Sequence, residues 1–538
     1  MADIEADVII VGSGISGALL AAKLSVAGVK VAILEAGARV GRAEARQRFW
    51  NAPVRVPECP YPPTPEANHP ISNDPDYWYR QAGPDTFKST YLKVVGGTTW
   101  HWLGTCLRFV PNDFRLRTAH GRGIDWPISY DELEPFYSEA EREIGVAGDS
   151  NETLGSPRSA GYPMPAIPQT FLDKAYARAL AGTEYELRAT PQARNSVSGN
   201  GRPACCGNAS CIPICPIGAK YDATMHLSVP EKNGAALHAQ TTATRIEIGG
   251  KGRVSAVRFK HWDGSEGVAR GKVFVLAAHA IETPRLLLHS RSEAMPKGMA
   301  NSSDQVGRNL MDHPTQLSWA LSREPVWPYR GPLSTSSIEK FRHGAFRKDR
   351  PAMRVEIGND GWSWPKGAPV STAAELAQQG LRGRALDTAL REHASRHVRL
   401  ASQVEQLADP ENRVTLDPNE RDMYGVPLPR LAYRLDSYVQ AGLAAARAAH
   451  TDIFGRLGAT GIEHRDAPEG AGHIMGTARM GSDRKNSVVD RDLRSHDHPN
   501  LFILGSAVFP TGATANPTLT IAALALRAAG EVKAALTQ

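Results

Sequence analysis

The first forty residues alternate between short apolar runs and a glycine-rich turn. Residues 7–11 are largely apolar, residues 12–17 read Gly-Ser-Gly-Ile-Ser-Gly, residues 18–26 favour a helix and residues 30–34 are apolar again. Continuous apolar runs of this length, bounded by turn residues, are typical of buried strands. The pattern predicts a strand, a tight turn, a helix and a second strand, which together form a βαβ unit.

Similar strand patterns recur far along the chain. Residues 272–278 form an apolar run, and residues 282–288 follow as a predicted helix with Pro284 near its start. Residues 501–505 form a third apolar run. Strands of one type in distant parts of the sequence predict a sheet assembled from a discontinuous domain.

Other parts of the chain have a different character. Residues 315–465 contain alternating strand-like pieces and an Arg-rich stretch at 372–399, which we interpret as a solvated helix within a second domain. Residues 50–75 are rich in proline and polar residues and predict an irregular excursion over the surface.

Composition and charge limit the function classes. The 538 residues are 41% hydrophobic and 22% charged, so the chain can bury the cores of two connected domains. The 62 basic and 56 acidic residues give a formal charge of +6, without a long block of like charges. We therefore expect no nucleic-acid partner.

The N-terminal residues and the hydrophobic runs bear on location. Residues 1–7 are acidic and lead directly into an apolar strand, so we expect the chain to have no export signal of its own. We also expect no membrane-spanning helix, because no run approaches about 18 apolar residues. Any membrane association is expected only through a partner.

The glycine-rich turn predicts a dinucleotide site. Gly12, Gly14 and Gly17 follow a strand and precede a helix, which lets the backbone approach a pyrophosphate at the helix N-terminus. Glu35 ends the second strand, where a carboxylate can accept hydrogen bonds from ribose hydroxyls. These residues do not distinguish FAD from NAD.

The C-terminal segment predicts a long helix. Asn516 is placed as its N-cap and Pro517 as its first residue, and the helix continues towards Leu536. One interpretation is a well-capped core helix. The other is that its positive end faces a flavin and stabilises the anion of the reduced ring.

Taken in order, the motifs resemble those of the glucose–methanol–choline (GMC) oxidoreductase family over essentially the whole chain. The matching segments are residues 12–17 with Glu35, 94–102, 306–314, His473 and 516–518. The resemblance implies an α/β fold with a discontinuous Rossmann-like FAD-binding domain and an α+β substrate-binding domain that contains an antiparallel sheet. We place the domains at 1–165, 220–315 and 466–538 for FAD, 166–219 for a cysteine-rich iron–sulfur segment, and 316–465 for substrate.

A cysteine cluster adds a second expected cofactor. Four of the six cysteines lie within residues 205–215, and the spacing Cys211-x3-Cys215-Pro216 matches the end of a ferredoxin-type ligand run. Within the family, this stretch resembles the large catalytic subunit of bacterial FAD-dependent sugar dehydrogenase complexes of the glucose, fructose, sorbitol and gluconate types. That resemblance implies a [3Fe–4S] cluster on Cys205, Cys211 and Cys215, with Cys206 spare or joined to a partner subunit. A zinc site, disulfides or free thiols are the alternatives.

The resemblance also implies roles for individual residues. His473 would be the base, since hydride removal from a carbinol carbon requires loss of the hydroxyl proton, and Asn516 would hold the substrate oxygen. His101 lies where some relatives attach FAD covalently. FAD-binding positions are expected at Gly12, Gly14, Gly17, Glu35, Gly96, Gly97, Thr98, His101, Gly505, Ser506, Pro517 and Thr518.

One departure concerns the substrate. Ala471 and Gly472 precede His473, where the sugar-complex relatives commonly have two asparagines that can bond sugar hydroxyls. Because two polar contacts are lost, we do not expect this chain to share the glucose or fructose specificity of those relatives. A bulkier glycoside, another ring position or another polyol becomes a stronger expectation.

The predicted function is FAD-dependent oxidation of a hydroxyl on a sugar, glycoside or polyol, with electrons leaving through the cluster to a cytochrome or quinone. The resembling complexes imply a small chaperone-like subunit with a twin-arginine signal, a cytochrome c acceptor and a place on the periplasmic face of the inner membrane. The alternatives are a soluble glycoside 3-dehydrogenase or sugar oxidase, with a cytoplasmic location also open, and a flavin-containing lyase.

Overall fold

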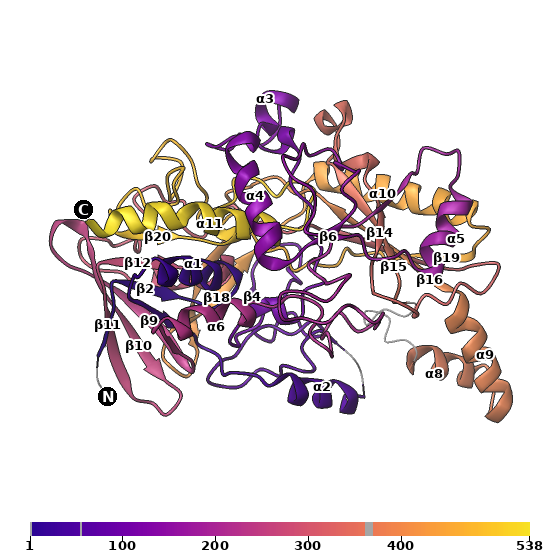
Figure 1. Ribbon diagram of the computed structural model, residues 1–538, viewed down its shortest axis with the longest axis horizontal. Helices are drawn as coiled ribbons and strands as arrows, with labels where there is room; N and C mark the ends of the chain where they lie inside the picture. Colours follow the sequence, from indigo (N-terminus) through magenta and orange to yellow (C-terminus); the bar gives the residue numbers. More distant parts are fainter. Residues whose placement is uncertain (1–2, 54–55, 361–369, 538) are drawn as a thin grey trace.

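A five-stranded parallel sheet organises the left-hand part of the molecule in Figure 1. The computed structural model describes residues 3–53, 56–360 and 370–537. The sheet runs in the order β20 (Leu501–Ile503), β12 (Val273–Leu276), β2 (Val8–Val11), β3 (Val31–Leu34) and β8 (Ala236–His238). Its three central strands are buried throughout, as expected when both faces of a parallel sheet are covered.

The predicted βαβ unit is confirmed. Strand β2, helix α1 (Ile15–Val26) and strand β3 follow one another, and β2 pairs with β3 in parallel. Helix α1 packs between α6 (Thr224–Lys232) and the C-terminal helix α11 (Thr518–Ala534). Because β12 and β20 join the same sheet from distant parts of the sequence, the sheet is discontinuous as predicted.

Two predicted helix starts were wrong. Helix α7 runs over His279–His289, so Pro284 lies inside the helix rather than near its start. Helix α11 begins at Thr518 with Pro517 in the cap position, and no side chain caps it. Asn516 does not act as the cap because its amide is engaged by other parts of the chain.

A six-stranded antiparallel sheet organises the right-hand part. Its order is β19 (Thr460–His464), β13 (Thr315–Leu321), β16 (His397–Val404), β15 (Met353–Gly358), β14 (Ser336–Ile338) and β7 (Leu187–Ala189). One face packs against α10 (Ser437–Arg456). On β16, Val398, Leu400 and Val404 belong to this core, so the alternate residues point to the opposite face. The predicted α/β class with an added antiparallel sheet is confirmed, while the exact domain boundaries stay a prediction.

The Arg-rich stretch does not form one helix. It contains α8 (Val370–Gln378) and α9 (Gly383–Arg396), and residues 397–399 already belong to β16. Gly380 and Gly383 fall at the break, where their low helix propensity favours an interruption. Both helices extend from the body at the lower right of Figure 1, and apart from Thr372 and Ser395 their residues are exposed or half-buried.

Smaller elements complete the fold. The remaining helices are α2 (Arg42–Asn51), α3 (Leu116–His120), α4 (Tyr130–Ile144) and α5 (Phe171–Ala179). A four-stranded sheet has the order β1 (Ile4–Glu5), β11 (Glu266–Arg270), β10 (Val254–His261) and β9 (Thr241–Ile248). A three-stranded sheet contains β17 (Arg413–Arg421), β18 (Pro427–Ala432) and β4 (Arg80–Gln81), and β5 (Ala147–Gly148) pairs with β6 (Met164–Pro165).

Within the described ranges, no helix combines the length and the apolar composition needed to cross a bilayer.

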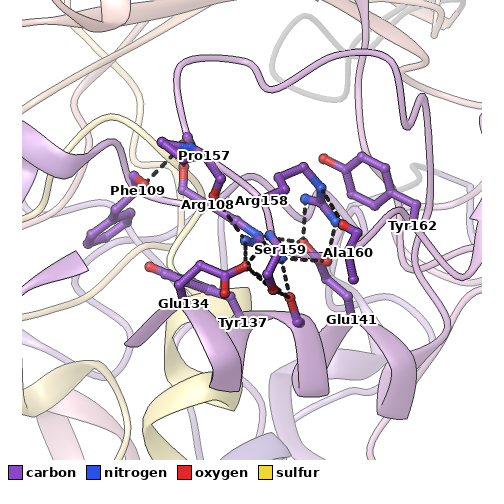
Figure 2. A network of polar contacts seen from close by, with 12 residues as sticks. Arg108, Phe109, Glu134, Tyr137, Glu141, Pro157, Arg158, Ser159, Ala160 and Tyr162 are labelled. Atoms are coloured by element: carbon purple, nitrogen blue, oxygen red, sulfur yellow. Dashed lines mark hydrogen bonds and ion pairs between the residues drawn. The ribbon is translucent and has the colours of Figure 1, made fainter. Parts of the chain in front are cut away.

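A buried ion-pair network fastens the segment after β5 to helix α4 (Figure 2). Arg108 donates through Nε and Nη2 to the two carboxylate oxygens of Glu141, both at 2.9 Å, and through Nη1 to Glu134 at 2.7 Å. Arg158 also donates to Glu141 and lies over the ring of Tyr162. Glu141 therefore bridges two arginines that are almost fully buried, and Arg108 also pairs with Glu134.

Replacing Glu141 with glutamine is expected to lower the free energy of unfolding by about 3–5 kcal/mol, because it leaves buried Arg158 without its counter-charge and Arg108 with Glu134 alone. Glu139→Gln is the matched control on the same helix, since Glu139 pairs with Lys23 in a partly exposed position and should cost about 1 kcal/mol or less. Urea unfolding of the FAD-loaded protein measures both. Equal losses in the two variants would contradict this assignment.

Candidate active site

A single large cavity brings together most of the predicted site residues. Its volume is about 680 Å³, and it extends from the carboxyl ends of β2, β3 and β12 to the face of the six-stranded sheet opposite α10. Ligands in open parallel sheets bind at this edge of the strands. The cavity therefore spans the predicted nucleotide site and the predicted substrate domain.

The nucleotide end is built from the first turn of the chain. Gly12 adopts a φ of +103°, and a Cβ on it would lie 2.6 Å from the carbonyl oxygen of Ala277. A Cβ on Gly17 would lie 2.1 Å from the oxygen of Gly12. These close approaches bring the N-terminus of α1 to the cavity, where its free N–H groups can bind a phosphate.

Glu35 is held at the end of β3 by three donors. The backbone N–H and hydroxyl of Ser13 donate to Oε2 at 3.0 and 2.6 Å, and the N–H of Gly37 donates to Oε1 at 2.9 Å. The N–H of Gly96 donates in turn to the Ser13 hydroxyl at 3.1 Å. Gly96 thus helps to position the glutamate instead of lining the cavity.

The residues that the sequence predicted for FAD binding and catalysis fall into two groups. Gly17 and Gly96 lie behind the cavity wall. The residues that line the cavity are Gly12, Gly14, Glu35, Gly97, Thr98, His101, His473, Gly505, Ser506, Asn516, Pro517 and Thr518. Residues from positions 12 to 518 therefore converge on one space.

His101 is a buried member of this wall. Its Nδ1 has no hydrogen-bond partner in the structure, and burial together with the charge of Lys220 lowers its pKa to about 3. A buried, neutral imidazole with an unsatisfied nitrogen fits a bound flavin, which could supply the missing partner. Whether a covalent bond forms there stays a prediction.

His473 lies at the opposite end of the predicted flavin site and contacts a second histidine. Its Nδ1 is 2.8 Å from Nδ1 of His313, and its Nε2 is 3.1 Å from the amide nitrogen of Asn516. Burial, followed by His313 and Arg354, lowers the pKa of His473 well below its usual value. The ring is therefore neutral near pH 7.

The hydrogen bonds fix which nitrogen of His473 carries the proton. His313 Nε2 lies 3.1 and 2.9 Å from the carbonyl oxygens of Gly512 and Ala513, so it must be the donor. Burial lowers the pKa of His313, so its Nδ1 keeps a lone pair and accepts from His473 Nδ1. His473 Nε2 is then the unprotonated nitrogen, available to accept a proton.

The amide of Asn516 is oriented by a buried cation. Arg354 Nη1 lies 3.4 Å from Asn516 Oδ1, so the amide nitrogen faces His473. Arg354 itself is fully buried and is paired with Glu339 and Glu356 on the six-stranded sheet. The two predicted catalytic residues therefore share one hydrogen-bonded site.

Asp312 holds the loop that carries His473. Its carboxylate accepts the backbone N–H groups of Ala471 and His473 at 3.2 and 3.0 Å, and also accepts from the Ser89 hydroxyl. Burial raises the pKa of Asp312 to about 6, so the carboxylate is ionised at neutral pH. This backbone clamp fixes His473 although residues 471 and 472 contribute no polar side chains.

The face of the six-stranded sheet that looks into the cavity carries polar side chains beside the apolar Leu317 and Ala401. Arg399 and Gln403 on β16 and Glu356 on β15 line it, and Arg399 is paired with Asp360 and lies 3.7 Å from Glu356. Carboxylate, guanidinium and amide groups can all hydrogen-bond to hydroxyls. These polar side chains line the same cavity as Ala471 and Gly472, which contribute no polar side chains to it.

Sequence reasoning missed several of these residues. Asp312 and His313 lie within the matching segment 306–314, but the sequence indicated no role for them. Their contacts with His473 join positions 161 and 160 residues apart. Arg354, Glu356 and Arg399 carried no local signal beyond strand alternation.

The segment 50–75 was also misjudged as a surface excursion. Glu58, Tyr61 and His69 are buried, and Val56, Pro57, Ser72, Asn73 and Pro75 line the cavity. Positions 54 and 55 lie outside the described residues.

The cysteine loop, residues 195–219, lies against the cavity wall. Ile212, beside Cys211, lines the cavity, and all six cysteines are free of disulfides. The backbone N–H groups of Gly207 and Lys220 donate to the sulfurs of Cys205 and Cys215, both at 3.4 Å. In the described part of the chain, no three His, Cys, Asp or Glu side chains converge to hold a single metal ion.

Comparison with protein families gives two matches. Residues 6–315 match the N-terminal GMC oxidoreductase family, and residues 408–525 match the C-terminal GMC oxidoreductase family. Together these matches cover most of the chain, including both ends of the cavity.

Individual relatives agree over nearly the full length. The chain is 39% identical to the fructose dehydrogenase large subunit of Gluconobacter japonicus, over 98% of each chain. It is 28% identical to 2-methyl-1,2-propanediol dehydrogenase of Mycolicibacterium austroafricanum, over 97% of this chain and 94% of the relative. The structure resembles pyridoxine 4-oxidase from Mesorbium loti with a TM-score of 0.64 at 18% identity, over 98% of this chain and 99% of the other.

Proposed function

The chain belongs to the GMC oxidoreductase family, and from that premise we propose that it is an FAD-dependent dehydrogenase that oxidises a hydroxyl group of a sugar, glycoside or polyol. The observation that carries this proposal is the unprotonated Nε2 of His473, which faces a cavity that reaches from the dinucleotide fingerprint to a polar sheet. FAD bound in this cavity would accept the hydride from the carbinol carbon.

The residues of the chain supply the proton chemistry. His473 Nε2 accepts the hydroxyl proton as the carbon loses its hydride, so the alcohol becomes a carbonyl without a charged intermediate. Asn516 donates an amide N–H to His473 Nε2 at 3.1 Å in the structure. With substrate bound between them, this amide would donate to the substrate oxygen and keep it beside the base. Arg354 holds the amide, and His313 holds the tautomer in which His473 Nε2 carries no proton.

The polar sheet favours a substrate with several hydroxyls. Glu356, Arg399 and Gln403 lie on the cavity side, opposite the nucleotide end. The two relatives named above act, by their names, on a ketose and on a diol. We therefore propose a polyhydroxylated compound as the substrate class. Because Ala471 and Gly472 provide no side-chain hydrogen bonds, the proposal does not extend to specificity for glucose or fructose.

An iron–sulfur cluster on Cys205, Cys211 and Cys215 forms the second part of the proposal. A single ion needs ligands that converge on one point, whereas each cysteine of a cluster binds a different iron. Free thiols, backbone N–H groups directed at two of the sulfurs and a nearby buried arginine with unpartnered nitrogens suit such an anionic group. The cluster would carry electrons away singly when bound.

Partner subunits follow from the same comparison. The Gluconobacter japonicus relative is named a large subunit, so we propose that this chain also works with a small chaperone-like subunit carrying a twin-arginine signal and with a cytochrome c. The exposed Cys206 is available for contact with a partner. Membrane attachment on the periplasmic face would come from those partners.

The electron acceptor tests the dehydrogenase proposal. The substrate-reduced enzyme is expected to pass electrons to dyes, quinones or cytochrome much faster than to dioxygen, because the proposed cluster provides a one-electron outlet. Stopped-flow reoxidation with each acceptor measures this preference. Rapid peroxide formation would instead favour a sugar oxidase, and a flavin that no substrate reduces would favour a lyase.

A further inference from the structure

Two buried cations stand at the base of the cysteine loop. Arg194 and Lys220 face each other in an antiparallel bridge that closes residues 195–219. The backbone bonds that flank it join Asn195 to Ala219 at 3.0 Å and Tyr221 to Ala193 at 2.8 Å. The relative exposures of Arg194 and Lys220 are 0% and 2%.

Neither cation forms an ion pair with a carboxylate among the described residues. The charge of Asp222 acts on Lys220, but Asp222 is paired with Arg42, and Nε and Nη1 of Arg194 have no hydrogen-bond partner. Like charges directly opposite each other in a bridge are destabilising, and a buried charge without a partner is more so. The arrangement calls for a negatively charged group beside Arg194.

The cysteines are the groups that surround this pair. Lys220 donates its backbone N–H to Cys215 Sγ at 3.4 Å and its ammonium group to the Cys211 carbonyl at 2.7 Å. The backbone N–H of Cys205 donates to the carbonyl of Asn195, the residue after Arg194, at 2.8 Å. All three proposed ligands therefore lie beside this pair of cations.

The same cations reach the wall of the flavin cavity. Arg194 Nη2 donates to the Leu103 carbonyl at 3.1 Å, and the Lys220 ammonium donates to the Trp100 carbonyl at 3.1 Å. His101 to Thr105 line the cavity. Arg194 and Lys220 thus lie between the proposed cluster and the proposed flavin.

We propose that Arg194, with Lys220, is the counter-charge of the iron–sulfur cluster and sets its reduction potential. The inference rests on the proposed function, because it assumes the cluster. Three thiolates and an oxidised [3Fe–4S] core carry a net charge of about −2, which two cations offset. Each electron taken from the reduced flavin adds one negative charge, so Arg194 favours the reduced cluster and raises its potential.

The test uses the anaerobically purified holoenzyme and its Arg194→Gln and Arg194→Lys variants. Iron per flavin and the midpoint potential of the [3Fe–4S] EPR signal are measured by redox titration. Arg194→Gln is expected to lower the equilibrium constant for one-electron reduction of the cluster at least tenfold, which lowers its midpoint potential by about 59 mV. Arg194→Lys should recover most of this shift in potential. Arg342→Gln is the matched control, since Arg342 is a buried arginine whose guanidinium donates to the Leu154 and Arg108 carbonyls.

The outcomes separate this inference from the proposed function. Wild-type enzyme that contains FAD but no iron would overturn the cluster itself. A cluster with the same potential in wild type and Arg194→Gln, or equal cluster loss from both Arg194 variants, would overturn the role of Arg194. If FAD content and melting temperature show that Arg194→Gln does not fold, Lys220→Gln is judged by the same criterion, because Lys220 is the other member of the pair.

Discussion

Replacing His473 with alanine is expected to slow reduction of the bound flavin by substrate about 10²–10⁴-fold, the range that a positioned general base contributes. The reason is the loss of the unprotonated Nε2 beside Asn516. FAD should remain bound, because the dinucleotide contacts lie at the other end of the cavity. Anaerobic stopped-flow absorbance of the flavin gives the rate.

Two controls make this result specific. His226→Ala removes a histidine on α6 that contacts Glu143 and Tyr221, and it should leave the rate close to that of wild type. His313→Leu removes the acceptor that fixes the His473 tautomer, and it should give an intermediate loss. An unchanged rate in His473→Ala would show that another group takes the proton.

The pH profile of the same step follows from the direction of the pKa shift. The neutral form of His473 is the active base, and burial, His313 and Arg354 lower its pKa well below 6.5. The rate should therefore show no titration centred at 6.5 and decline only at lower pH, first as Asp312, whose pKa is about 6, loses the charge that holds the His473 loop, and then as His473 becomes protonated. A decline centred at 6.5 or above would contradict the buried setting of this base.

Replacing Cys211 with serine is expected to remove the iron almost completely, from about three atoms per flavin. Reduction of the flavin by substrate should persist, while electron transfer to cytochrome should be lost because its one-electron outlet is missing. Iron analysis and the [3Fe–4S] EPR signal of anaerobically purified protein measure the effect.

Cys206→Ser is the matched control for that experiment. Cys206 is exposed, whereas Cys211 and Cys215 are buried, and we expect it to be spare as an iron ligand. Iron that is retained by Cys211→Ser, or lost equally from Cys206→Ser, would contradict the proposed ligand set.

The sequence predicted the features that depend on local pattern. The strands and turn around Gly12 were placed to within a few residues, because apolar runs and glycines determine them directly. The cysteine cluster at 205–215 was recognisable from the spacing of its residues. The start of α11 was predicted wrongly because Asn516 has the local character of a cap, whereas its amide is used by His473 and Arg354.

The remaining site residues depend on contacts between distant segments. His313 fixes the tautomer of His473 through carbonyl groups near residue 512, so three separate regions must meet before its role exists. Arg194 looks like an ordinary arginine in the sequence, and only its burial and its unpartnered nitrogens set it apart. Such roles arise from packing and have no periodic signal.

Anaerobic addition of sugars, glycosides and polyols, including fructose, to the FAD-loaded enzyme tests the proposed activity most directly. The absorbance of the oxidised flavin reports hydride transfer without any external acceptor. At least one polyhydroxylated compound is expected to bleach the flavin fully, with a corresponding carbonyl product. A folded, FAD-loaded enzyme whose flavin stays oxidised with every alcohol in the panel would contradict it.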